Sequence, residues 1–375
     1  MSPAADSPTW FCDFNAGSEV DADVLALFVA TERSCPANPA SVHAAGRRSR
    51  AVLEEARSRI GTALGLPASD VLFTSGGTEA ANLAVAGLGD PHLPVLLSPA
   101  EHPAVLEPAL TRGVVWLAVD RDGAAALAQT DRPVGLVSLV HAQSELGTIQ
   151  PVAEAATLAR RLGVPLFVDA AQSLGRVDLA PVVASGAVVA LSPHKAHGLR
   201  GHGVLAGRDL ARHLRPLLRG GSQEHALRPG TQSPALALAN ALAIERAIVQ
   251  RAATATAMFG VRAAFLDGFR STNIDHHLLT PLANSVPNTV MIAFPRVDGR
   301  NLLPALDLAG VQASHGSACS SGAPTPPRIL GAIGLDDELA RACVRFSFAA
   351  DASRTHMHEG GRRVGDVVGR LQKKK

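Results

Sequence analysis

The chain has 375 residues, 47% of them hydrophobic, and a formal net charge of +2 at pH 7. This length is typical of two domains, and a nearly neutral chain with dispersed basic residues gives no support for direct binding to nucleic acid or to a membrane surface. Tyr is absent and aromatic residues make up 3% of the chain, which excludes a tyrosine acid and leaves few rings for stacking on nucleic-acid bases.

The first ten residues, MSPAADSPTW, contain no basic segment followed by an apolar one, and no apolar run reaches the ~18 residues of a membrane-spanning helix. The four cysteines, Cys12, Cys35, Cys319 and Cys343, are irregularly spaced and form no CxxC motif. We therefore expect a soluble cytoplasmic protein with free thiols, without a signal peptide, a disulfide framework or a metal site.

The first half of the chain alternates between two kinds of pattern. In residues 41–65, Val52, Ala56 and Ile60 recur on one face and predict a helix, and residues 71–87 predict a strand, a glycine turn and a helix. Short apolar runs follow, mostly separated by helical patterns, at 94–99, 113–119, 134–142, 164–171 and 187–194. This alternation predicts an α/β fold with a parallel sheet covered on both faces, in which ligands bind at the carboxyl ends of the strands.

The pattern changes after residue 233. Residues 233–269 predict a long helix that bridges to a second unit, which mixes predicted strands and helices at 288–294, 301–310, 343–349 and 361–372. We expect a large domain over 16–258 and a smaller α+β domain made of 1–15 and 259–375.

Two polar clusters at predicted strand ends suit a phosphate and a heterocyclic ring. In TSGGTEAAN (74–82), glycines before a helix expose N–H groups that favour an anion, although such turns are common. Asp169 ends an apolar strand, where it either caps the next turn or accepts a hydrogen bond from a protonated ring nitrogen. Gln172 lies three residues later and could reach the same ligand.

Three further clusters complete the set. Lys195 follows an apolar strand, and although most lysines are simply solvated, a buried lysine with a lowered pKa forms a Schiff base with a carbonyl. Ser192 and His194 could flank a phosphate, and His102 either stacks on a flat ring or has a structural role. Polar side chains of HAQSELG (141–147) end another strand. Together the clusters specify a site for pyridoxal phosphate.

With these motifs the chain resembles the cysteine desulfurase family, which is class V aminotransferase-like and belongs to the fold-type-I pyridoxal-phosphate enzymes. The resemblance covers nearly the whole chain and implies a large domain with a mainly parallel seven-stranded sheet. It also rests on DFNAGSEV (13–20), NPASVHAAGR (38–47), GGSQEHALRPGTQS (220–233), SHGSACSSG (314–322) and VRFSF (344–348).

The resemblance implies a role for each matching residue. Lys195 would hold the cofactor and act as acid and base, and Arg345 would bind the substrate carboxylate. Cys319 would be the nucleophile, carried on a loop of small residues that lets it travel. The other implied contacts are Asp169 to the ring nitrogen, Gln172 to the ring hydroxyl, His102 stacked on the ring as a proton shuttle, Gly77, Thr78, Ser192 and His194 to the phosphate, and Thr231 to the phosphate of a neighbouring subunit in a homodimer.

The implied reaction converts L-cysteine to L-alanine and leaves a persulfide on Cys319 for a protein or thiol acceptor. The chain departs from the family at several positions, among them Gln143 and Ser144, where two asparagines are usual, so that Ser144 would contact the ring oxygen weakly or through water. Gly17–Ser18, His315 and Pro229 are further departures. A selenocysteine lyase or related lyase, and a poorly active sulfur-assembly scaffold, are the alternatives. The acceptor stays open between iron–sulfur clusters, tRNA thiolation, DNA sulfur modification and a biosynthetic pathway.

Overall fold

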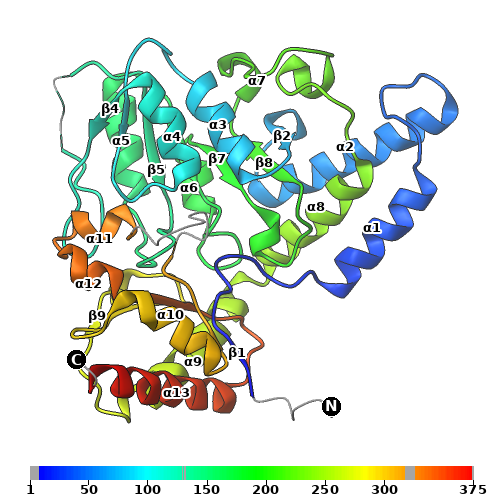
Figure 1. Cartoon of the computed structure of the whole chain (residues 1–375). Coiled ribbons are helices and arrows are strands. Elements are labelled where there is room, and N and C mark those ends of the chain that lie inside the picture. Colours follow the sequence, from blue (N-terminus) through cyan, green and yellow to red (C-terminus); the bar gives the residue numbers. More distant parts are fainter. Residues whose placement is uncertain (1–7, 129, 131, 317–325, 374–375) are drawn as a thin grey trace.

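The computed structural model describes residues 8–128, 130, 132–316 and 326–373. The larger lobe is built on a seven-stranded sheet (Figure 1), whose strand order is β2-β8-β7-β6-β5-β3-β4. The strands are β2 (Val71–Thr74), β3 (Val95–Leu97), β4 (Val114–Trp116), β5 (Leu136–Val140), β6 (Leu166–Asp169), β7 (Val188–Leu191) and β8 (Gly203–Ala206). Neighbours are parallel except that β8 is antiparallel to both β2 and β7. The predicted mainly parallel seven-stranded sheet is confirmed.

Alternate residues of the central strands face two separate cores. Val137 and Leu139 of β5 lie in a core with the apolar faces of α2 and α8, whereas Leu136 lies in a core with α3 and α4. Helices therefore cover both faces of the sheet. The helices of this lobe are α1 (Ala22–Ser34), α2 (Ala44–Leu64), α3 (Gly77–Gly87), α4 (Pro103–Arg112), α5 (Val152–Leu162), α6 (Ala180–Ala184), α7 (Leu210–His213) and α8 (Pro234–Val249).

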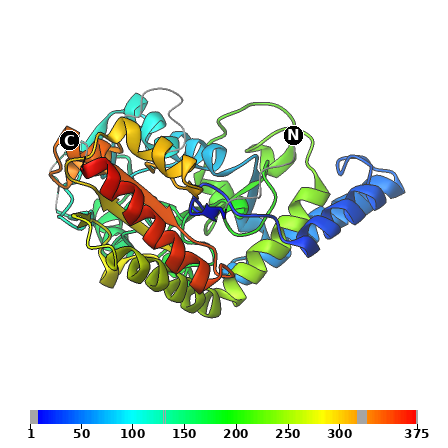
Figure 2. The same cartoon turned by 60° about the horizontal axis from the view of Figure 1, so that its bottom comes forward.

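The smaller lobe combines short sheets with helices. An antiparallel sheet has the order β12 (Cys343–Ser347), β10 (Thr289–Ala293) and β9 (His277–Leu278), and β1 (Trp10–Phe11) pairs in parallel with β11 (Val311–Gln312). The helices are α9 (Arg251–Arg270), α10 (Gly299–Leu308), α11 (Arg328–Ala332), α12 (Asp337–Arg341) and α13 (Arg354–Gln372). Figure 2 shows α9 and α13 side by side in this lobe. Trp10 and Cys12 lie in its core with Phe265 and Phe346.

The predicted long helix over 233–269 is two helices. The chain turns at Gln250, where φ is −88° and ψ is 0°, so that α8 ends and α9 begins at that residue. The break lets α8 pack on α2 in the larger lobe while α9 packs on α13 in the smaller one. No helix in the described part of the chain has both the length and the apolar composition needed to cross a membrane.

Candidate active site

One cavity of about 220 Å³ gathers most of the predicted site residues. It lies at the carboxyl ends of β5, β6 and β7, where Val140, Asp169 and Ser192 line it. Ten predicted residues line this cavity, namely Gly77, Thr78, His102, Ser144, Asp169, Gln172, Ser192, His194, Lys195 and Arg345. Thr231 is exposed and does not line it, and Cys319 lies outside the described residues.

The N-terminus of α3 forms one end of the cavity. Its N-cap, Gly76, supplies no side-chain acceptor, so the first N–H groups of the helix remain available to an anion. Gly77 leaves room for the Ser192 hydroxyl, because a Cβ at this position would displace Ser192 Oγ. Burial, with Lys195 and Arg200 nearby, lowers the pKa of His194 to about 4. The neutral imidazole of His194, the hydroxyls of Thr78 and Ser192, and the free N–H groups of α3 are suited to bind a phosphate.

Asp169 combines the two roles that the sequence left open. Its Oδ1 accepts a hydrogen bond from the Ala171 N–H at 2.9 Å, so it caps the turn after β6. The same side chain lines the cavity, and its charge acts on His102 and Lys195. A carboxylate held by a backbone N–H at this place is suited to pair with a cationic ring nitrogen.

His102 is fixed by the start of α4. It is the N-cap residue, and its Nδ1 accepts a hydrogen bond from the Ala104 N–H at 3.1 Å. That bond assigns the ring proton to Nε2 and opposes a second proton on Nδ1. Burial also lowers the pKa of His102, although Asp169 raises it. The ring is therefore neutral near pH 7 and presents Nε2–H as a donor.

Lys195 lies at the end of a short turn after β7 and lines the cavity. Burial lowers the pKa of its amine, and the positive charges of Arg176 and Arg345 lower it further, whereas Asp169 and Glu145 raise it. The arrangement favours a neutral amine, which is the form that attacks a carbonyl and accepts a proton.

Arg345 is a fully buried arginine on β12, with a relative exposure of 2%. Its Nη2 donates to Asp13 Oδ1 at 2.6 Å, and its Nη1 donates to the carbonyl oxygens of Gly316 at 2.8 Å and Ser144 at 3.2 Å. Its Nε has no partner among the described residues. A buried, incompletely paired guanidinium that lines the cavity is suited to a carboxylate ligand.

The departures at Gln143 and Ser144 have different consequences. Gln143 is turned away from the cavity, and its Oε1 accepts from the N–H groups of Glu145 and Leu146 at 2.8 and 2.6 Å. Ser144 does line the cavity. Of these two positions, only Ser144 lines the cavity directly, whereas Gln143 contacts the lining residue Glu145.

Several residues of the site carry no role in the sequence analysis. Asn15 lines the cavity, and its carbonyl oxygen accepts from Gln172 Nε2 at 3.0 Å. Asp13 holds Arg345, and Glu145 lines the cavity. The signal for Asp13 and Asn15 was their place in DFNAGSEV, a polar run that follows the first apolar residues. Their partners lie more than 100 residues away in the sequence, so their contacts needed the structure.

The three described cysteines are free thiols, and two of them are deeply buried. Burial raises the pKa of Cys12, and it raises the pKa of Cys343 to about 12. Neither thiol forms a thiolate near neutral pH, which makes both unsuited to nucleophilic attack.

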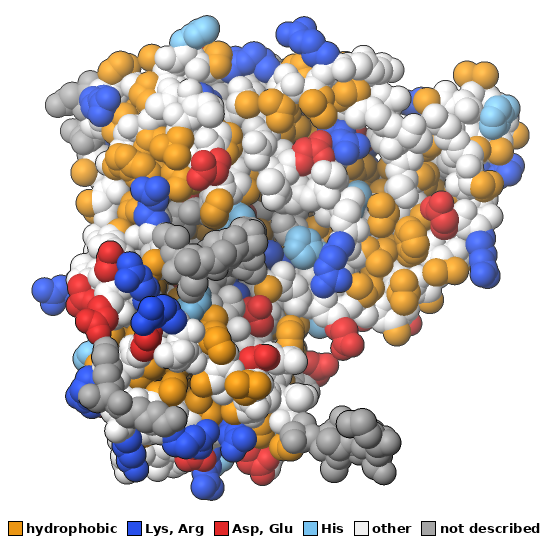
Figure 3. Space-filling view, viewed as in Figure 1, with side chains coloured by type: hydrophobic (Ala, Val, Ile, Leu, Met, Phe, Trp, Pro, Cys, Tyr) orange, Lys and Arg blue, Asp and Glu red, His pale blue; other side chains and the backbone are white. Residues whose placement is uncertain are grey.

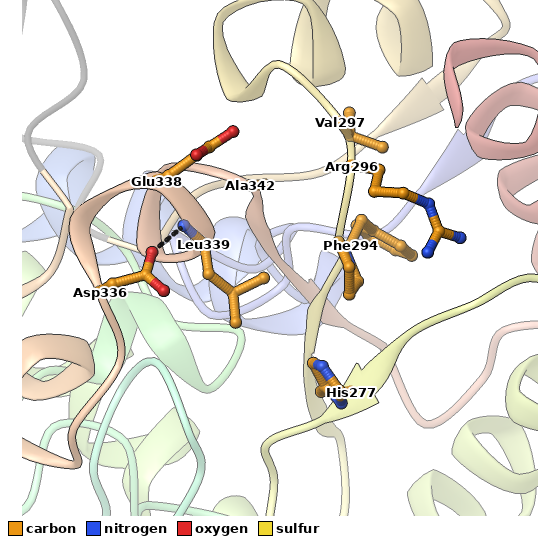
Figure 4. Close-up of a pocket in the computed structure, with 9 residues that line it drawn as sticks. His277, Phe294, Arg296, Val297, Asp336, Glu338, Leu339 and Ala342 are labelled. Carbon is orange, nitrogen blue, oxygen red and sulfur yellow. Dashed lines mark hydrogen bonds between the residues drawn. The ribbon is translucent and has the colours of Figure 1, made fainter. Parts of the chain in front are cut away.

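A second cavity lies in the smaller lobe and has a volume of about 470 Å³. Figure 4 shows Glu338 and Leu339 of α12, with its N-cap Asp336, on one side and Phe294, Arg296 and Val297, which follow β10, on the other. The dashed line is the bond that Asp336 accepts from the Leu339 N–H at 2.8 Å, which caps α12. None of the predicted site residues lines this cavity.

Comparisons with known proteins agree with this geometry. The sequence pattern of the aminotransferase class-V family matches residues 10–357, so the chain belongs to that family. It is 34% identical over 323 residues to the cysteine desulfurase IscS of Dictyoglomus turgidum, a match that covers 83% of this chain and 82% of the relative. Within class V the chain therefore belongs to the cysteine desulfurases, and it is an enzyme.

Solved structures show the same fold. A NifS-like protein superposes with a TM-score of 0.85 and 28% identity, covering 97% of this chain and 100% of the other. SspA in complex with cysteine superposes with a TM-score of 0.77 and 26% identity, covering 91% of this chain and 99% of that one. Enzymes of class V work with pyridoxal phosphate.

Proposed function

We propose that this chain binds pyridoxal phosphate in the 220 Å³ cavity and converts L-cysteine to L-alanine, leaving a persulfide on Cys319. The observation that carries the proposal is the convergence of Lys195, Asp169 and Arg345 on the cavity that the α3 N-terminus closes. An amine, a ring-nitrogen acceptor, an anion site and a carboxylate site are the four recognition elements that the cofactor and an amino acid require.

The residues present fit the cofactor. Its phosphate would lie against the α3 N-terminus, with Gly77, Thr78, Ser192 and His194 as donors, because a glycine at 77 keeps that space open. Gln172 and Ser144 would contact the ring oxygen, and His102 would cover the ring. The cofactor supplies an aldehyde that captures an amine and a ring that accepts electrons when a bond at Cα breaks.

The side chains of this chain perform the remaining work. Arg345 binds the carboxylate of L-cysteine, which orients Cα toward Lys195. Neutral Lys195 removes the Cα proton, and Asp169 keeps the ring nitrogen protonated. The Cys319 thiolate attacks the substrate sulfur, so that an S–S bond forms to Cys319 and the Cβ–S bond breaks, leaving its electron pair on the carbon fragment. Cβ then takes up one proton, Lys195 returns one proton to Cα, and L-alanine leaves. SspA, a structural relative, is described in complex with cysteine, which supports this substrate.

The decisive experiment measures alanine released from L-cysteine in the presence of a reductant. Wild type, Cys319→Ala and the control Cys35→Ala are compared, and the visible spectrum of each is recorded first. We expect cofactor in all three and alanine from wild type and the control only. Alanine release that persists in Cys319→Ala would contradict the persulfide step and favour a lyase that does not use this thiol. Normal cofactor binding without alanine from any of them would favour the poorly active scaffold.

The same proposal includes a homodimer with shared sites. Thr231 is exposed and lies outside the cavity of its own chain, so it is free to reach the phosphate site of a second copy. Figure 3 shows hydrophobic side chains gathered over α1 and α8, and Leu25 and Val29 of α1 are 48% and 40% exposed. Exposed apolar groups of this kind are typical of a contact surface.

The expected cytoplasmic location suits this chemistry, because a reducing compartment keeps Cys319 as a thiol between cycles. The acceptor of the persulfide is a protein or a small thiol that reaches residues 314–322. The charges on the face shown in Figure 3 are mixed in sign, which gives no reason to prefer a polyanionic acceptor.

A further inference from the structure

Arg176 is a buried cation that the reaction described above does not use. It lies seven residues after Asp169, in the turn that follows β6, and its relative exposure is 3%. Within the described part of the chain, no carboxylate forms an ion pair with it, and its Nε has no hydrogen-bond partner. A buried guanidinium without a carboxylate is costly, and an isolated charge in such a place calls for an explanation.

Each hydrogen bond of the Arg176 guanidinium goes to a residue of the predicted cofactor site. Its Nη1 donates to the Gln172 carbonyl oxygen at 3.1 Å and also contacts Gln172 Oε1. Its Nη2 donates to the Lys195 carbonyl oxygen at 3.2 Å. Its guanidinium carbon lies 5.4 Å from the ring centre of Phe14, which packs against its face.

These contacts fix the Gln172 amide. Because Arg176 occupies Oε1, the Gln172 side chain must present its NH₂ group elsewhere, and Nε2 donates to the Asn15 carbonyl oxygen at 3.0 Å. One N–H of that group then remains for an acceptor in the cavity. A hydroxyl or oxyanion on a ring would accept it, which is the role expected of Gln172.

Arg176 contacts Lys195 from outside the predicted cofactor cavity. Lys195 lines both the 220 Å³ cavity and a third, larger cavity of about 1000 Å³. Arg176 lines only this larger cavity. The other charged or titratable groups that act on Lys195 are Asp169, Glu145, Arg345, His102 and His194. Arg176 and Arg345 oppose a proton on the lysine nitrogen, and the two carboxylates favour one.

We propose that Arg176 is a positioning residue for Lys195 and Gln172. It orients the Gln172 amide, holds the Lys195 backbone, and places a positive charge near the Lys195 nitrogen. The charge keeps the Lys195 nitrogen neutral at physiological pH. The hydrogen bonds hold the Gln172 amide where it can contact the ring oxygen. Burial and the nearby charge of Arg345 lower the pKa of Arg176 to about 9, so its guanidinium is still charged near pH 7. It also donates in a fixed plane to three oxygens. The inference deepens the proposed function, since it assumes that Lys195 holds the cofactor.

The test is a pH titration of the cofactor's visible absorbance in the holoenzyme, without L-cysteine. Its midpoint reports protonation of the Lys195 nitrogen. Removal of the charge in Arg176→Met should raise the midpoint by about one pH unit, since a nearby positive charge opposes protonation. Arg176→Lys, which keeps the charge, should stay near the wild-type midpoint. The matched control is Arg161→Met, which removes an exposed arginine of α5.

Cofactor retention separates orientation from charge. Both Arg176 variants should release the cofactor several-fold faster than wild type during dilution, because neither methionine nor lysine can donate to all three oxygens. If Arg176→Met does not fold, Arg176→Gln gives the same comparison with a shorter polar head. An unmoved midpoint in the folded neutral variant would overturn the proposal, even with a lower unfolding temperature, because a purely structural role changes stability and not protonation.

Neither readout requires the desulfurase reaction. A shifted midpoint with no alanine release from wild type would support the role of Arg176 and contradict the proposed reaction. An unshifted midpoint with normal alanine release would do the reverse.

Discussion

Glu101 is a carboxylic acid that the fold holds in its neutral form. Its Oε1 accepts from the Val140 N–H at 2.8 Å, its Oε2 has no partner among the described residues, and its relative exposure is 7%. Burial, with the nearby charge of Asp169, raises the pKa of Glu101 from 4.5 to about 8. A proton on Glu101 leaves Asp169 as the carboxylate that is proposed to pair with the ring nitrogen.

This shifted pKa predicts how stability depends on pH. Between 4.5 and about 8 the folded state keeps a proton that the unfolded state has released, so the free energy of unfolding falls as pH rises through this window. Glu101→Gln mimics the neutral acid and should remove this slope. Between pH ~5.5 and pH ~7.5, its free energy of unfolding should therefore increase by about 2 kcal/mol relative to that of wild type.

Urea unfolding followed by circular dichroism at the two pH values checks the prediction. The control is Glu107→Gln, which removes an exposed acid from α4, the helix that begins two residues after Glu101. Equal losses in wild type and Glu101→Gln would show that Glu101 is ionised in the folded protein.

Asp13 holds the side chain of Arg345, which is predicted to bind the substrate carboxylate. Its bond to Arg345 Nη2 is 2.6 Å long, and the Asp13 side chain is 23% exposed. We expect Asp13→Ala to raise KM for L-cysteine about tenfold with a smaller change in kcat, because a charge-assisted bond of about 1.5 kcal/mol that holds the guanidinium is lost. Asp13→Asn keeps an oxygen acceptor, so its KM should lie between those of wild type and Asp13→Ala.

Steady-state alanine release over a range of L-cysteine concentrations gives both constants. An unchanged or lower KM in Asp13→Ala would mean that Asp13 competes with the substrate for Arg345.

At the scale of an element, the segment before Thr231 has an unusual backbone. Glu224, His225 and Ala226 all have positive φ values, of 48°, 57° and 61°. A buried ion pair holds this segment, since Glu224 pairs with Arg57 at 2.7 Å and accepts from the Phe73 N–H at 2.9 Å. These contacts tie the segment to the sheet and maintain a conformation that L-residues avoid.

Ala226 is the position where this strain can be relieved. Glycine adopts a positive φ without penalty, and the gain exceeds the loss of chain entropy, so Ala226→Gly should stabilise the fold by about 0.5–1 kcal/mol. Ala253→Gly, an exposed position inside α9, should instead destabilise it by about 1 kcal/mol. Thermal unfolding of the two variants beside wild type gives the comparison. A lower unfolding temperature for Ala226→Gly would show that Cβ contacts there outweigh the strain.

Buried strands were the elements that the sequence predicted best. Each of the five apolar runs from 94 to 194 contains one strand, β3 to β7, because continuous Val and Leu runs between helical patterns have few other solutions. The turn at Gln250 and the antiparallel β8 carried no such signal. The turn at Gln250 results from the packing of α8 and α9 on different lobes. The direction of β8 results from its pairing with β2 and β7.

Residues at strand ends were also predictable for the site. Asp169, Ser192 and Lys195 stand out because polar groups after buried strands are costly unless they have a ligand. Arg176 and Asp13 carried no such signal. Their meaning depends on contacts with Lys195 and Arg345, which the fold alone brings near them.

At the scale of the whole molecule, one site depends on both lobes. In the larger lobe, β6 supplies Asp169 and the turn after β7 supplies Lys195, and β12 of the smaller lobe supplies Arg345. Arg345 also bonds to the Gly316 carbonyl oxygen, directly before residues 317–325. Binding of a carboxylate to Arg345 would therefore act on the base of the segment that carries the proposed nucleophile.

The proposed homodimer is tested at this same scale. Figure 1 places α1 at the edge of the larger lobe, and Leu25 and Val29 lie one turn apart on it with large exposed areas. If a second copy covers this face, Leu25→Glu with Val29→Glu should convert a particle of about twice 38.7 kDa into one of 38.7 kDa, as measured by light scattering. The control is Leu308→Glu on α10, where the leucine is 90% exposed.

Cofactor retention connects the assembly to the site. If Thr231 completes the phosphate site of the partner copy, the monomeric variant and Thr231→Ala should both release the cofactor faster than wild type, and only the former should change in mass. The loss of one hydroxyl bond to a phosphate corresponds to about a tenfold weaker affinity. A wild-type monomer that retains its cofactor would contradict the shared site, because every phosphate donor would then come from a single chain.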